Sequence, residues 1–342
     1  MRLCQLTLTM DIRAVTKRFA GRTALAAVLA VISAGSGAAD SLKLRLSSDD
    51  AVPAIPESAP IKPDYEAATR PDQIGRIIVP VMIDGQGPFQ FALDTGANTT
   101  VLTPHLVAAL GINLTADADV TMNGATGSAS VPTALIERVA AGDIVLENQQ
   151  LPVADALATA IDGILGVDGL EAKRIMVDFK KNRIEIRDAR RERPIAWAKR
   201  IPAQMNFGRL VVVDATVDDV RVKAVIDTGS QYTLGNDALR AALKLPERVN
   251  EDASIDVYGA TLDKQRGQRQ RVLAIQVGDL KVSHLNVAFG DFYVFKLWAL
   301  DTRPALVIGM DLIGLLDKLV IDYDRQEVQF RTRTTLAAFH LE

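Results

Sequence analysis

Cysteine and histidine are nearly absent from this sequence. Its 342 residues include one cysteine, Cys4, and three histidines that lie far apart, at positions 105, 284 and 340. A zinc site of the common kind needs several such ligands at short spacings, and a disulfide framework needs paired cysteines. The sequence therefore predicts no metal, no cofactor and no disulfide, and the apolar core is expected to supply the stability.

Long runs of one charge are also absent. Lys and Arg number 39 against 42 Asp and Glu, which gives a net charge of −3. This balance gives no indication of a nucleic acid or an anionic membrane as a partner. With 48% hydrophobic and 24% charged residues, the composition is that of an ordinary globular chain, long enough for two domains.

The first 39 residues have the pattern of an export signal. Basic residues between positions 13 and 22 precede an apolar run over 23–35, and small residues follow at 36–39. The run is shorter than the roughly 20 apolar residues that a transmembrane helix needs, and an uncleaved N-terminal membrane anchor is the alternative. We therefore expect an exported protein, periplasmic or secreted.

Residues 40–73 have the composition of an extended arm. The segment is rich in Ser, Asp and Ala and contains Pro53, Pro56, Pro60, Pro63 and Pro71. Such a composition is typical of a linker, because proline cannot continue a helix or a central strand. The alternative is an inhibitory propeptide, in which Lys43 or Lys62 would pair with acidic groups of the mature protein.

An Asp-Thr-Gly triplet occurs twice, each time directly after an apolar run. The first copy lies in residues 91–97 (FALDTGA) and the second in residues 224–230 (AVIDTGS). A carboxylate at the end of a buried strand needs a compensating role, because desolvating a charge is costly. Since Asp94 and Asp227 share the same local context, we expect the two carboxylates to meet at one site.

The residues around the triplets repeat in the same order. Segment 124–126 (GAT) returns at 259–261, 142–143 (GD) at 278–279, 164–168 (ILGVD) at 307–311 (VIGMD), and 176–179 (MVDF) at 320–323 (VIDY). The spacing between copies grows slowly, as loop insertions in a duplicated domain would make it. The sequence thus predicts an internal duplication with halves at 74–190 and 200–332.

Strand signals dominate each half. The pattern predicts a hairpin over 75–93 with its turn at 84–87, and a matching hairpin over 210–226 with its turn at Asp218 and Asp219. Each hairpin delivers one Asp-Thr-Gly into a loop. Short helices are expected over 104–110, ended by Gly111, and over 236–243, with Asn236 as the N-cap.

On these motifs the chain resembles the aspartic proteases, in particular the bacterial retropepsin-like group. The resemblance covers about residues 74–332 and rests on both Asp-Thr-Gly motifs and on the downstream apolar-apolar-Gly segments at 164–166 and 307–309. It implies an all-β, double-lobed acid-protease fold made of two tandem retropepsin-like β-barrel domains with short helices. It also implies a monomer that forms an intramolecular pseudo-dimer, with the active site at the lobe junction.

The resemblance implies a role for each motif residue. The catalytic pair would be Asp94 and Asp227. Support of the active-site loops would come from Thr95, Gly96, Ala97, Thr228, Gly229 and Ser230, with the two threonines hydrogen-bonded across the junction. Flap-like hairpins over the cleft would contain Gly124, Ala125, Thr126, Tyr258, Gly259 and Ala260.

Two adjacent carboxylates suit the hydrolysis of peptide bonds. They share one proton, because both cannot easily ionise; the ionised member would draw a proton from water while the protonated member donates to the scissile carbonyl. The expected function is that of an exported aspartic endopeptidase that cleaves a peptide or protein substrate without a covalent intermediate. The alternative is a catalytically silent peptide-binding protein of the same fold.

The two copies differ in the residue after the glycine, Ala97 against Ser230. A hydroxyl at Ser230 is expected to donate a hydrogen bond to the Asp227 carboxylate and to favour its charged form. The sequence therefore predicts that Asp227 is more often ionised and Asp94 more often protonated.

Four other aspartates also repeat between the halves: Asp168, Asp178, Asp311 and Asp322. We interpret them as turn or strand-end residues, because most such side chains accept hydrogen bonds from nearby backbone donors.

Overall fold

Strands dominate the part of the chain that the computed structural model describes, which is residues 76–155, 161–191, 200–246 and 253–332. These residues all belong to one structural unit, which includes Asp64–Glu342. The predicted export signal (1–39) and arm (40–73) lie outside the described residues, and the boundaries of the predicted halves stay predictions. Within the described ranges, no helix is long and apolar enough to cross a membrane.

The first lobe is a six-stranded sheet in the order β3-β8-β2-β1-β6-β7. Its strands are β1 (Ile78–Ile83), β2 (Gln86–Leu93), β3 (Val101–Leu102), β6 (Thr133–Ala141), β7 (Ile144–Pro152) and β8 (Gly163–Leu165). The turn between β1 and β2 lies at Asp84 and Gly85, which both have positive φ, as the hairpin prediction requires. The other predicted landmark is also confirmed: α2 (Pro104–Leu110) is capped by Thr103 and ends at Gly111 with φ 66°.

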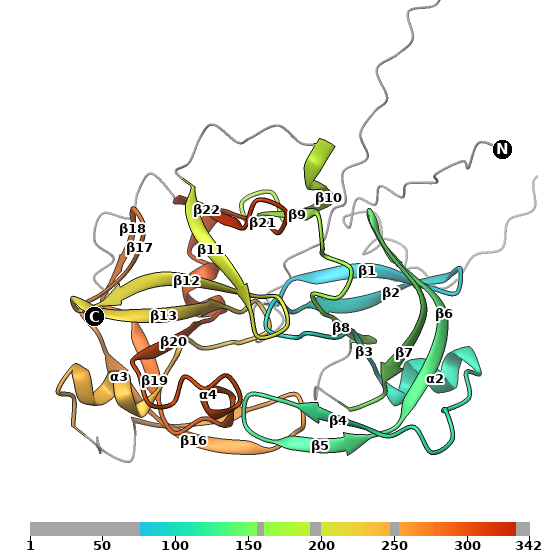
Figure 1. Ribbon diagram of the computed structural model, residues 1–342, viewed down its shortest axis with the longest axis horizontal. Helices are drawn as coiled ribbons and strands as arrows, with labels where there is room; N and C mark the ends of the chain where they lie inside the picture. Colours follow the sequence, from blue (N-terminus) through green and yellow to red (C-terminus); the bar gives the residue numbers. More distant parts are fainter. Residues whose placement is uncertain (1–75, 156–160, 192–199, 247–252, 333–342) are drawn as a thin grey trace, which may run out of the picture. The chain divides into compact units, whose positions relative to one another are not determined.

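The second lobe repeats this topology. Its strands β14 (Leu234–Gly235), β20 (Ala305–Ile308), β13 (Val220–Ile226), β12 (Leu210–Val217), β17 (Ala274–Val277) and β18 (Leu280–Ser283) pair in the same succession. In both lobes the strand that leads into the Asp-Thr-Gly loop is paired in parallel, β2 with β8 and β13 with β20. Helix α3 (Asp237–Ala242), which is labelled in Figure 1, follows β14. Its N-cap is Asn236, as predicted.

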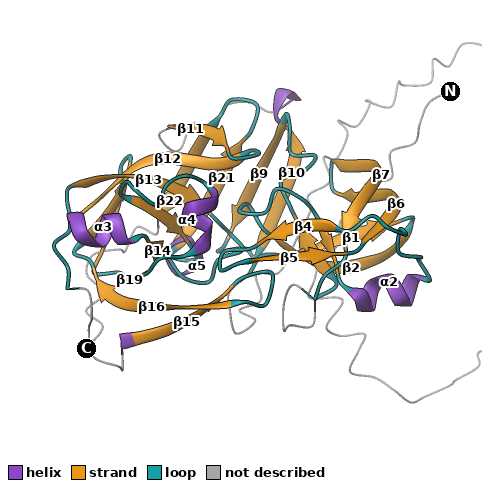
Figure 2. Ribbon diagram, turned by 60° about the horizontal axis from the view of Figure 1, so that its bottom comes forward, coloured by secondary structure: helices purple, strands orange, loops and turns teal. Residues whose placement is uncertain are grey.

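Each lobe also carries a long hairpin. The first is β4 (Val120–Asn123) with β5 (Ser128–Val131), and the second is β15 (Ser254–Tyr258) with β16 (Lys264–Arg271). The second hairpin joins the larger sheet through β19 (Asn286–Phe289), whereas the first pairs only with itself (Figure 2). The second lobe further contains the short helices α4 (Tyr293–Leu297) and α5 (Met310–Ile313), which the sequence analysis does not predict.

Strands from both halves combine into a sheet at the lobe junction. The first half contributes β9 (Lys173–Asp178) and β10 (Arg183–Asp188), and the second contributes β21 (Leu316–Asp322) and β22 (Glu327–Thr332). Because β9 pairs with β21, the order is β10-β9-β21-β22, and β11 (Ile201–Asn206) continues it into the second lobe. The two lobes are therefore joined by backbone hydrogen bonds as well as by side-chain packing.

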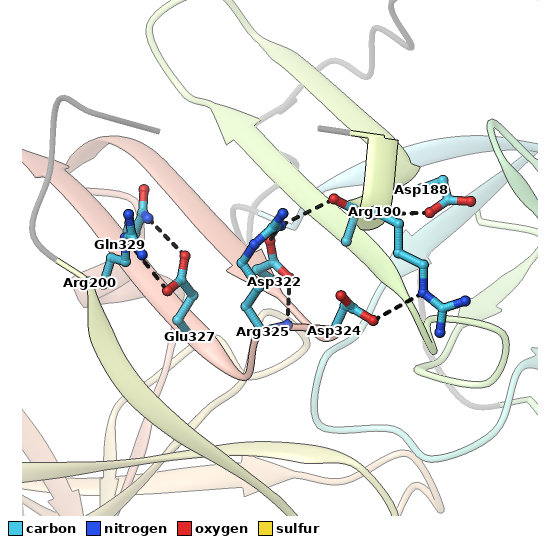
Figure 3. Close-up of polar contacts among 9 residues, drawn as sticks. Asp188, Arg190, Arg200, Asp322, Asp324, Arg325, Glu327 and Gln329 are labelled. Atoms are coloured by element: carbon cyan, nitrogen blue, oxygen red, sulfur yellow. Dashed lines mark hydrogen bonds and ion pairs between the residues drawn. The ribbon is translucent and has the colours of Figure 1, made fainter. Parts of the chain in front are cut away.

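Polar contacts fasten the turn between β21 and β22 to the first half (Figure 3). Arg190, in the 3₁₀ turn Ala189–Arg191, donates from Nε to Asp324 Oδ1 at 3.4 Å. Arg325 donates to the Ala189 carbonyl at 3.1 Å and to Asp322 Oδ2 at 2.6 Å. The segment 322–325 is thus held in place from both sides of the junction.

A continuous apolar core extends through both lobes. Its largest fully buried side chains include Phe91, Phe289, Phe292 and Phe295. A smaller buried cluster, which we call the hairpin cluster, consists of Val101, Met122, Val131, Ala154 and Ile164. It packs the first hairpin against the first-lobe sheet.

Candidate active site

The two Asp-Thr-Gly loops begin in the same way at the ends of buried strands. The last three residues of β2 and of β13 are buried, so each loop starts from a fixed point in the core. The Asp94 N–H donates to the Leu165 carbonyl at 3.0 Å, and the Asp227 N–H donates to the Ile308 carbonyl at 3.0 Å. The parallel strands β8 and β20 therefore set the position of each aspartate backbone.

Thr95 and Thr228 connect the two loops across the junction, as the sequence analysis expects. Both are buried, and the backbone N–H of each donates to the hydroxyl of the other at 3.1 Å. The Thr95 hydroxyl in turn donates to the Ile226 carbonyl at 2.8 Å. The Thr228 hydroxyl donates to the Leu93 carbonyl, also at 2.8 Å. The N–H and the hydroxyl of both threonines thereby have hydrogen-bond partners within the protein and need no water.

Gly96 and Gly229 let each aspartate side chain lie against the opposite loop. A Cβ atom at Gly96 would lie 2.5 Å from Asp227 Cγ, and one at Gly229 would overlap Asp94 Cγ. Each glycine N–H also donates to its own aspartate, Gly96 to Asp94 Oδ1 and Gly229 to Asp227 Oδ1, both at 2.8 Å. The two carboxyl groups therefore meet at the junction, and any side chain at either glycine would separate them.

The two carboxyl groups differ in their electrostatic surroundings. Burial raises the pKa of both carboxyl groups, because it disfavours the charged form. At Asp227 the negative charge of Asp94 raises the pKa further, well above its usual range. Backbone N–H groups oppose the increase at both carboxyl groups, that of Gly96 at Asp94 and those of Gly229 and Ser230 at Asp227, and the charge of Arg76 opposes it further at Asp94. The electrostatics of the site thus favour the proton on Asp227.

The predicted role of Ser230 is wrong. Its hydroxyl donates to the Tyr232 carbonyl at 2.8 Å and leaves the Asp227 carboxylate alone. Asp227 accepts the backbone N–H of Ser230 instead, at 3.1 Å, and a backbone donor is available at this position whatever the side chain. The expectation that Asp227 is the more often ionised member therefore loses the hydrogen bond on which it rested, because that hydroxyl satisfies a turn.

Two threonines that the sequence analysis did not single out hold each loop to its own lobe. The Thr100 hydroxyl and N–H donate to the two oxygens of Asp168 at 2.7 and 2.8 Å. The Thr233 hydroxyl and N–H donate to the two oxygens of Asp311 at 2.6 and 2.9 Å. Asp168 and Asp311 are thus structural acceptors, as interpreted from sequence, and burial raises the pKa of both carboxyl groups. A threonine six residues after each motif aspartate was the available signal.

The second repeated motif packs directly on the loops. A Cβ at Gly166 would lie 2.9 Å from the Ala97 carbonyl oxygen, and one at Gly309 would lie 3.0 Å from the Ser230 carbonyl oxygen. The N–H of the following residue donates to that same oxygen at 2.8 Å in both lobes. The apolar-apolar-Gly segments therefore pack against the Asp-Thr-Gly loops and hydrogen-bond to them.

The tips of the two long hairpins touch each other. The Thr126 hydroxyl donates to the Asp263 carbonyl at 2.6 Å. A Cβ at Gly124 would lie 3.0 Å from the Ala260 nitrogen, and one at Gly259 would collide with Thr126. Ala260 also packs against the hairpin cluster, which Ala97 of the first loop contacts as well. The tips therefore lie beside the first Asp-Thr-Gly loop.

Tyr258 is the one flap candidate that the structure does not bring to this contact. It ends β15 with 65% of its surface exposed. The first hairpin is held by α4 instead: the Val294 N–H donates to the Ala125 carbonyl at 3.1 Å, and the Tyr293 hydroxyl donates to Asn123 Oδ1 at 3.1 Å. Both hairpins are thus fastened by the second lobe.

An apolar cavity of about 540 Å³ lies between α2 and the first hairpin. Val107, Ala108, Met122, Ala129 and Leu262 are among its lining residues. The cavity brings together side chains of α2, of the first hairpin and of the tip of the second.

The equivalent place in the second lobe is filled. Val131 borders the cavity on the first hairpin, and the ladder registers make Gly267 its counterpart on the second. A Cβ at Gly267 would lie 2.8 Å from Cζ of the fully buried Phe292. The ring of Phe292 therefore occupies the space that the first lobe leaves open.

The comparisons with known proteins agree with this geometry. The model of the aspartyl protease family matches the chain twice, over residues 79–168 and 213–312, together more than half of its length. The crystal structure of aspartic proteinase from Irpex lacteus is similar with a TM-score of 0.52 and 13% sequence identity, over 80% of this chain and 98% of that chain. At this identity the likeness concerns the fold alone, and it confirms the predicted all-β, double-lobed acid-protease fold. No curated protein gives a significant match.

Proposed function

The chain belongs to the aspartyl protease family and is a peptide hydrolase, and we propose that it cuts peptide bonds with Asp94 and Asp227 as its catalytic dyad. The observation that carries the proposal is the crossed packing of the two side chains, in which each aspartate lies against the glycine of the opposite loop. Neither half alone supplies both carboxyl groups. One chain with both halves completes the site, which supports a monomer with an intramolecular pseudo-dimer.

The proposed mechanism uses the two carboxyl groups in opposite protonation states. The ionised aspartate takes a proton from a water molecule whose oxygen attacks the scissile carbonyl carbon. The protonated aspartate donates its proton to the carbonyl oxygen, so that a neutral gem-diol forms. When this intermediate collapses, the C–N bond breaks, the first aspartate returns its proton to the leaving nitrogen, and the second recovers one from a diol hydroxyl.

The two long hairpins support an extended peptide as the substrate. Their joined tips lie beside the first loop, as flaps over a substrate would, and Gly124, Ala125, Thr126, Gly259 and Ala260 form that contact. Closure over the substrate would exclude bulk water and strengthen the electrostatic interactions of the dyad. No step of the mechanism requires a metal or a cofactor.

Export to the periplasm or secretion is part of the proposal. It rests on the basic residues, the short apolar run and the small residues within positions 1–39. Fusion of residues 1–39 to a reporter that is active only outside the cytoplasm tests it. An inactive reporter would contradict export.

Peptide cleavage by the purified protein tests the central proposal. A mixed peptide library, incubated across pH 3–8, should yield defined fragments. Asp94→Asn and Asp227→Asn should each lower the rate by on the order of 10²–10⁴-fold, because either change removes one half of the proton exchange. Both variants must keep the unfolding behaviour of the unmodified protein for the comparison to count.

The same experiment decides against a silent peptide-binding protein, which no observation favours. Such a protein would produce no fragments, and the two asparagine variants would bind the library peptides as the unmodified protein does. Cleavage that survives both substitutions would exclude the dyad.

A further inference from the structure

The cross-strand neighbour of the dyad aspartate is a cation in the first lobe. The Ile77 carbonyl accepts the Leu93 N–H at 2.8 Å, which continues the β1–β2 ladder by one step and places Arg76 opposite Asp94. Opposite residues of an antiparallel ladder share a face, with Cβ atoms about 4.5–5.5 Å apart. Arg76 is 7% exposed, so its charge acts on Asp94 with little screening by solvent.

The equivalent neighbour in the second lobe is apolar. Val212 lies opposite Val225, and the same ladder places Leu210 opposite Asp227. Leu210 is fully buried and carries no charge. The sequence counterpart of Arg76 is Arg209, one position before Leu210, and it pairs with Glu171. The same step of the ladder therefore gives the two aspartates different electrostatic surroundings.

A second difference between the surroundings of the two aspartates lies at the junction sheet. The repeat pairs Asp322-Tyr323 with Asp178-Phe179, and both aromatic residues follow a strand of the junction. Their backbones are held alike: the Tyr323 N–H donates to the Lys173 carbonyl at 3.0 Å, and the Phe179 N–H donates to the Asp317 carbonyl at 2.9 Å. Tyr323 is buried and Phe179 is partly buried, and Tyr323 alone of the two carries a hydroxyl group.

The hydroxyl of Tyr323 is enclosed in the protein. Tyr323 is buried, and within the described part of the chain its hydroxyl has no hydrogen-bond partner. Burying a hydroxyl without a partner costs free energy that a phenyl ring, as at Phe179, would not incur. Burial and the negative charge of Asp94 raise the pKa of Tyr323, so its hydroxyl stays protonated and lies within the electrostatic reach of that carboxylate. The residues on either side of Tyr323 are bound: Asp322 accepts a hydrogen bond from Arg325, and Asp324 accepts one from Arg190 (Figure 3).

We propose that Arg76 and Tyr323 are positioning residues that make the two aspartates unequal, holding Asp94 in the ionised form and leaving the shared proton on Asp227. The inference rests on the proposed use of both aspartates as the dyad. It assigns Asp94 as the group that takes the proton from water and Asp227 as the donor to the scissile carbonyl. The charge of Arg76 acts on Asp94, and the charge of Asp94 acts on both Tyr323 and Asp227. Each aspartate also accepts backbone N–H groups of its own loop.

Paired variants test this assignment, because each of the two residues has a matched position in the other half of the chain. Tyr323→Phe makes both junction positions phenylalanine, and Phe179→Tyr adds a hydroxyl at the matched position of the first half. Arg76→Leu makes both cross-strand positions leucine, and Arg76→Lys restores the charge. Each variant is titrated by NMR with ¹³C-carboxyl-labelled aspartate, and Asp94→Asn and Asp227→Asn assign the two signals.

The carboxyl of Asp94 is expected to titrate at the lower pH in the unmodified protein. Arg76→Leu should move that step up by about one pH unit, and Arg76→Lys should return it most of the way. Tyr323→Phe should raise the pH of the Asp94 titration step by less than Arg76→Leu does, and Phe179→Tyr should lower the pH of the Asp227 step. The acidic limb of the kcat/KM profile should follow the Asp94 step in every variant. A change that only disturbed folding would lower the rate at all pH values and would not be rescued by lysine.

The titration and the cleavage assay separate the two levels of the proposal. If the Asp94 step lies above that of Asp227, or if neither Arg76→Leu nor Tyr323→Phe moves it, the inference is wrong even for an active protease. If the steps shift as expected but no peptide is cut, the unequal protonation of the two aspartates stands and the proposed function fails. Since Tyr323→Phe removes a single atom from a buried ring, it gives a decision even if Arg76→Leu does not fold.

Discussion

Thr95 and Thr228 exchange hydrogen bonds, each donating its N–H to the other's hydroxyl at 3.1 Å. Since each threonine follows a dyad aspartate, the position of either carboxyl group depends on a side chain from the opposite half. The geometry of the site is therefore a property of the junction and not of either lobe.

Loss of one of these hydroxyls should weaken the junction. Thr228→Val leaves the Thr95 N–H and the Leu93 carbonyl buried without partners, and we expect a loss of about 2–4 kcal/mol in the free energy of unfolding. Denaturant unfolding measures it. Thr228→Ser keeps the hydroxyl and should recover most of the loss; equal effects of valine and serine would contradict the hydrogen-bond explanation.

The contact between the hairpin tips should control how often they open. Thr126→Val removes the hydrogen bond to the Asp263 carbonyl, which is worth about 1 kcal/mol. Amide hydrogen exchange at residues 124–127 and 259–263 should then become faster by roughly fivefold. Thr121→Val changes an exposed threonine on the same hairpin and serves as the control. Unchanged exchange in both variants would show that the tips are held by other contacts.

The ion pair between Asp178 and Lys318 links β9 to β21 and should make the junction sensitive to acid. Its atoms are 2.7 Å apart, and the Asp178 side chain is 6% exposed. Burial by itself would raise the pKa of Asp178, but the hydrogen bond and the charge from Lys318 outweigh it and lower the pKa from 3.8. Because the folded-state pKa is depressed, the pair contributes its full stability above the unfolded-state value and loses it as the pH falls through the folded-state value.

Asp178→Asn should therefore destabilise the protein by on the order of 1–3 kcal/mol at neutral pH. The difference from the unmodified protein should shrink below about pH 4, where the unfolded carboxyl is protonated. Thermal unfolding between pH 2 and 7 measures it. Asp214→Asn removes a pair with Lys223 in which Asp214 is 82% exposed, so it should have little effect at any pH. A pH-independent effect of Asp178→Asn would refute the argument.

The cavity beside the first hairpin should accept a large apolar side chain of the substrate. Ala129→Phe would fill part of it from the hairpin side. We expect kcat/KM to fall by about tenfold or more for peptides with large apolar residues, with little change for peptides with small ones. Ala109→Phe places the same ring on an exposed position of α2 that does not line the cavity. If both variants leave the preference unchanged, the cavity plays no part in selection.

Local signals made much of the fold predictable. The turn at Asp84 and Gly85, the helix ended by Gly111 and the cap at Asn236 each depend on residues within a few positions of one another, and all three are confirmed. Helix α4 was missed because it has no N-cap side chain and forms where the second half carries extra residues. The pairing of β9 with β21 could not be predicted either, since registers between distant strands leave no trace in local composition.

The site residues that could be predicted are those that occur in both copies of the repeat. The two aspartates, threonines and glycines were found because they recur in order, and the structure brings them together. The role of Ser230 was misjudged because a hydroxyl has several acceptors in reach, and the sequence does not reveal that it bonds to the Tyr232 carbonyl. Gly75-Arg76 recurs as Gly208-Arg209 at the spacing of the two aspartates, but the repeat does not reveal which arginine lies beside a carboxyl group. Only the strand register places Arg76 opposite Asp94.

The order β10-β9-β21-β22 has a consequence for either half expressed by itself. Without its partner, β9 or β21 would become a free edge that presents a row of unpaired N–H and C=O groups. Such an edge would pair most readily with the same edge of a second copy, because β9 and β21 are similar in sequence and pair in antiparallel orientation. The covalent link keeps the matching hairpin at a high effective concentration, so that the strand of the same chain pairs with the edge before a strand of another molecule does.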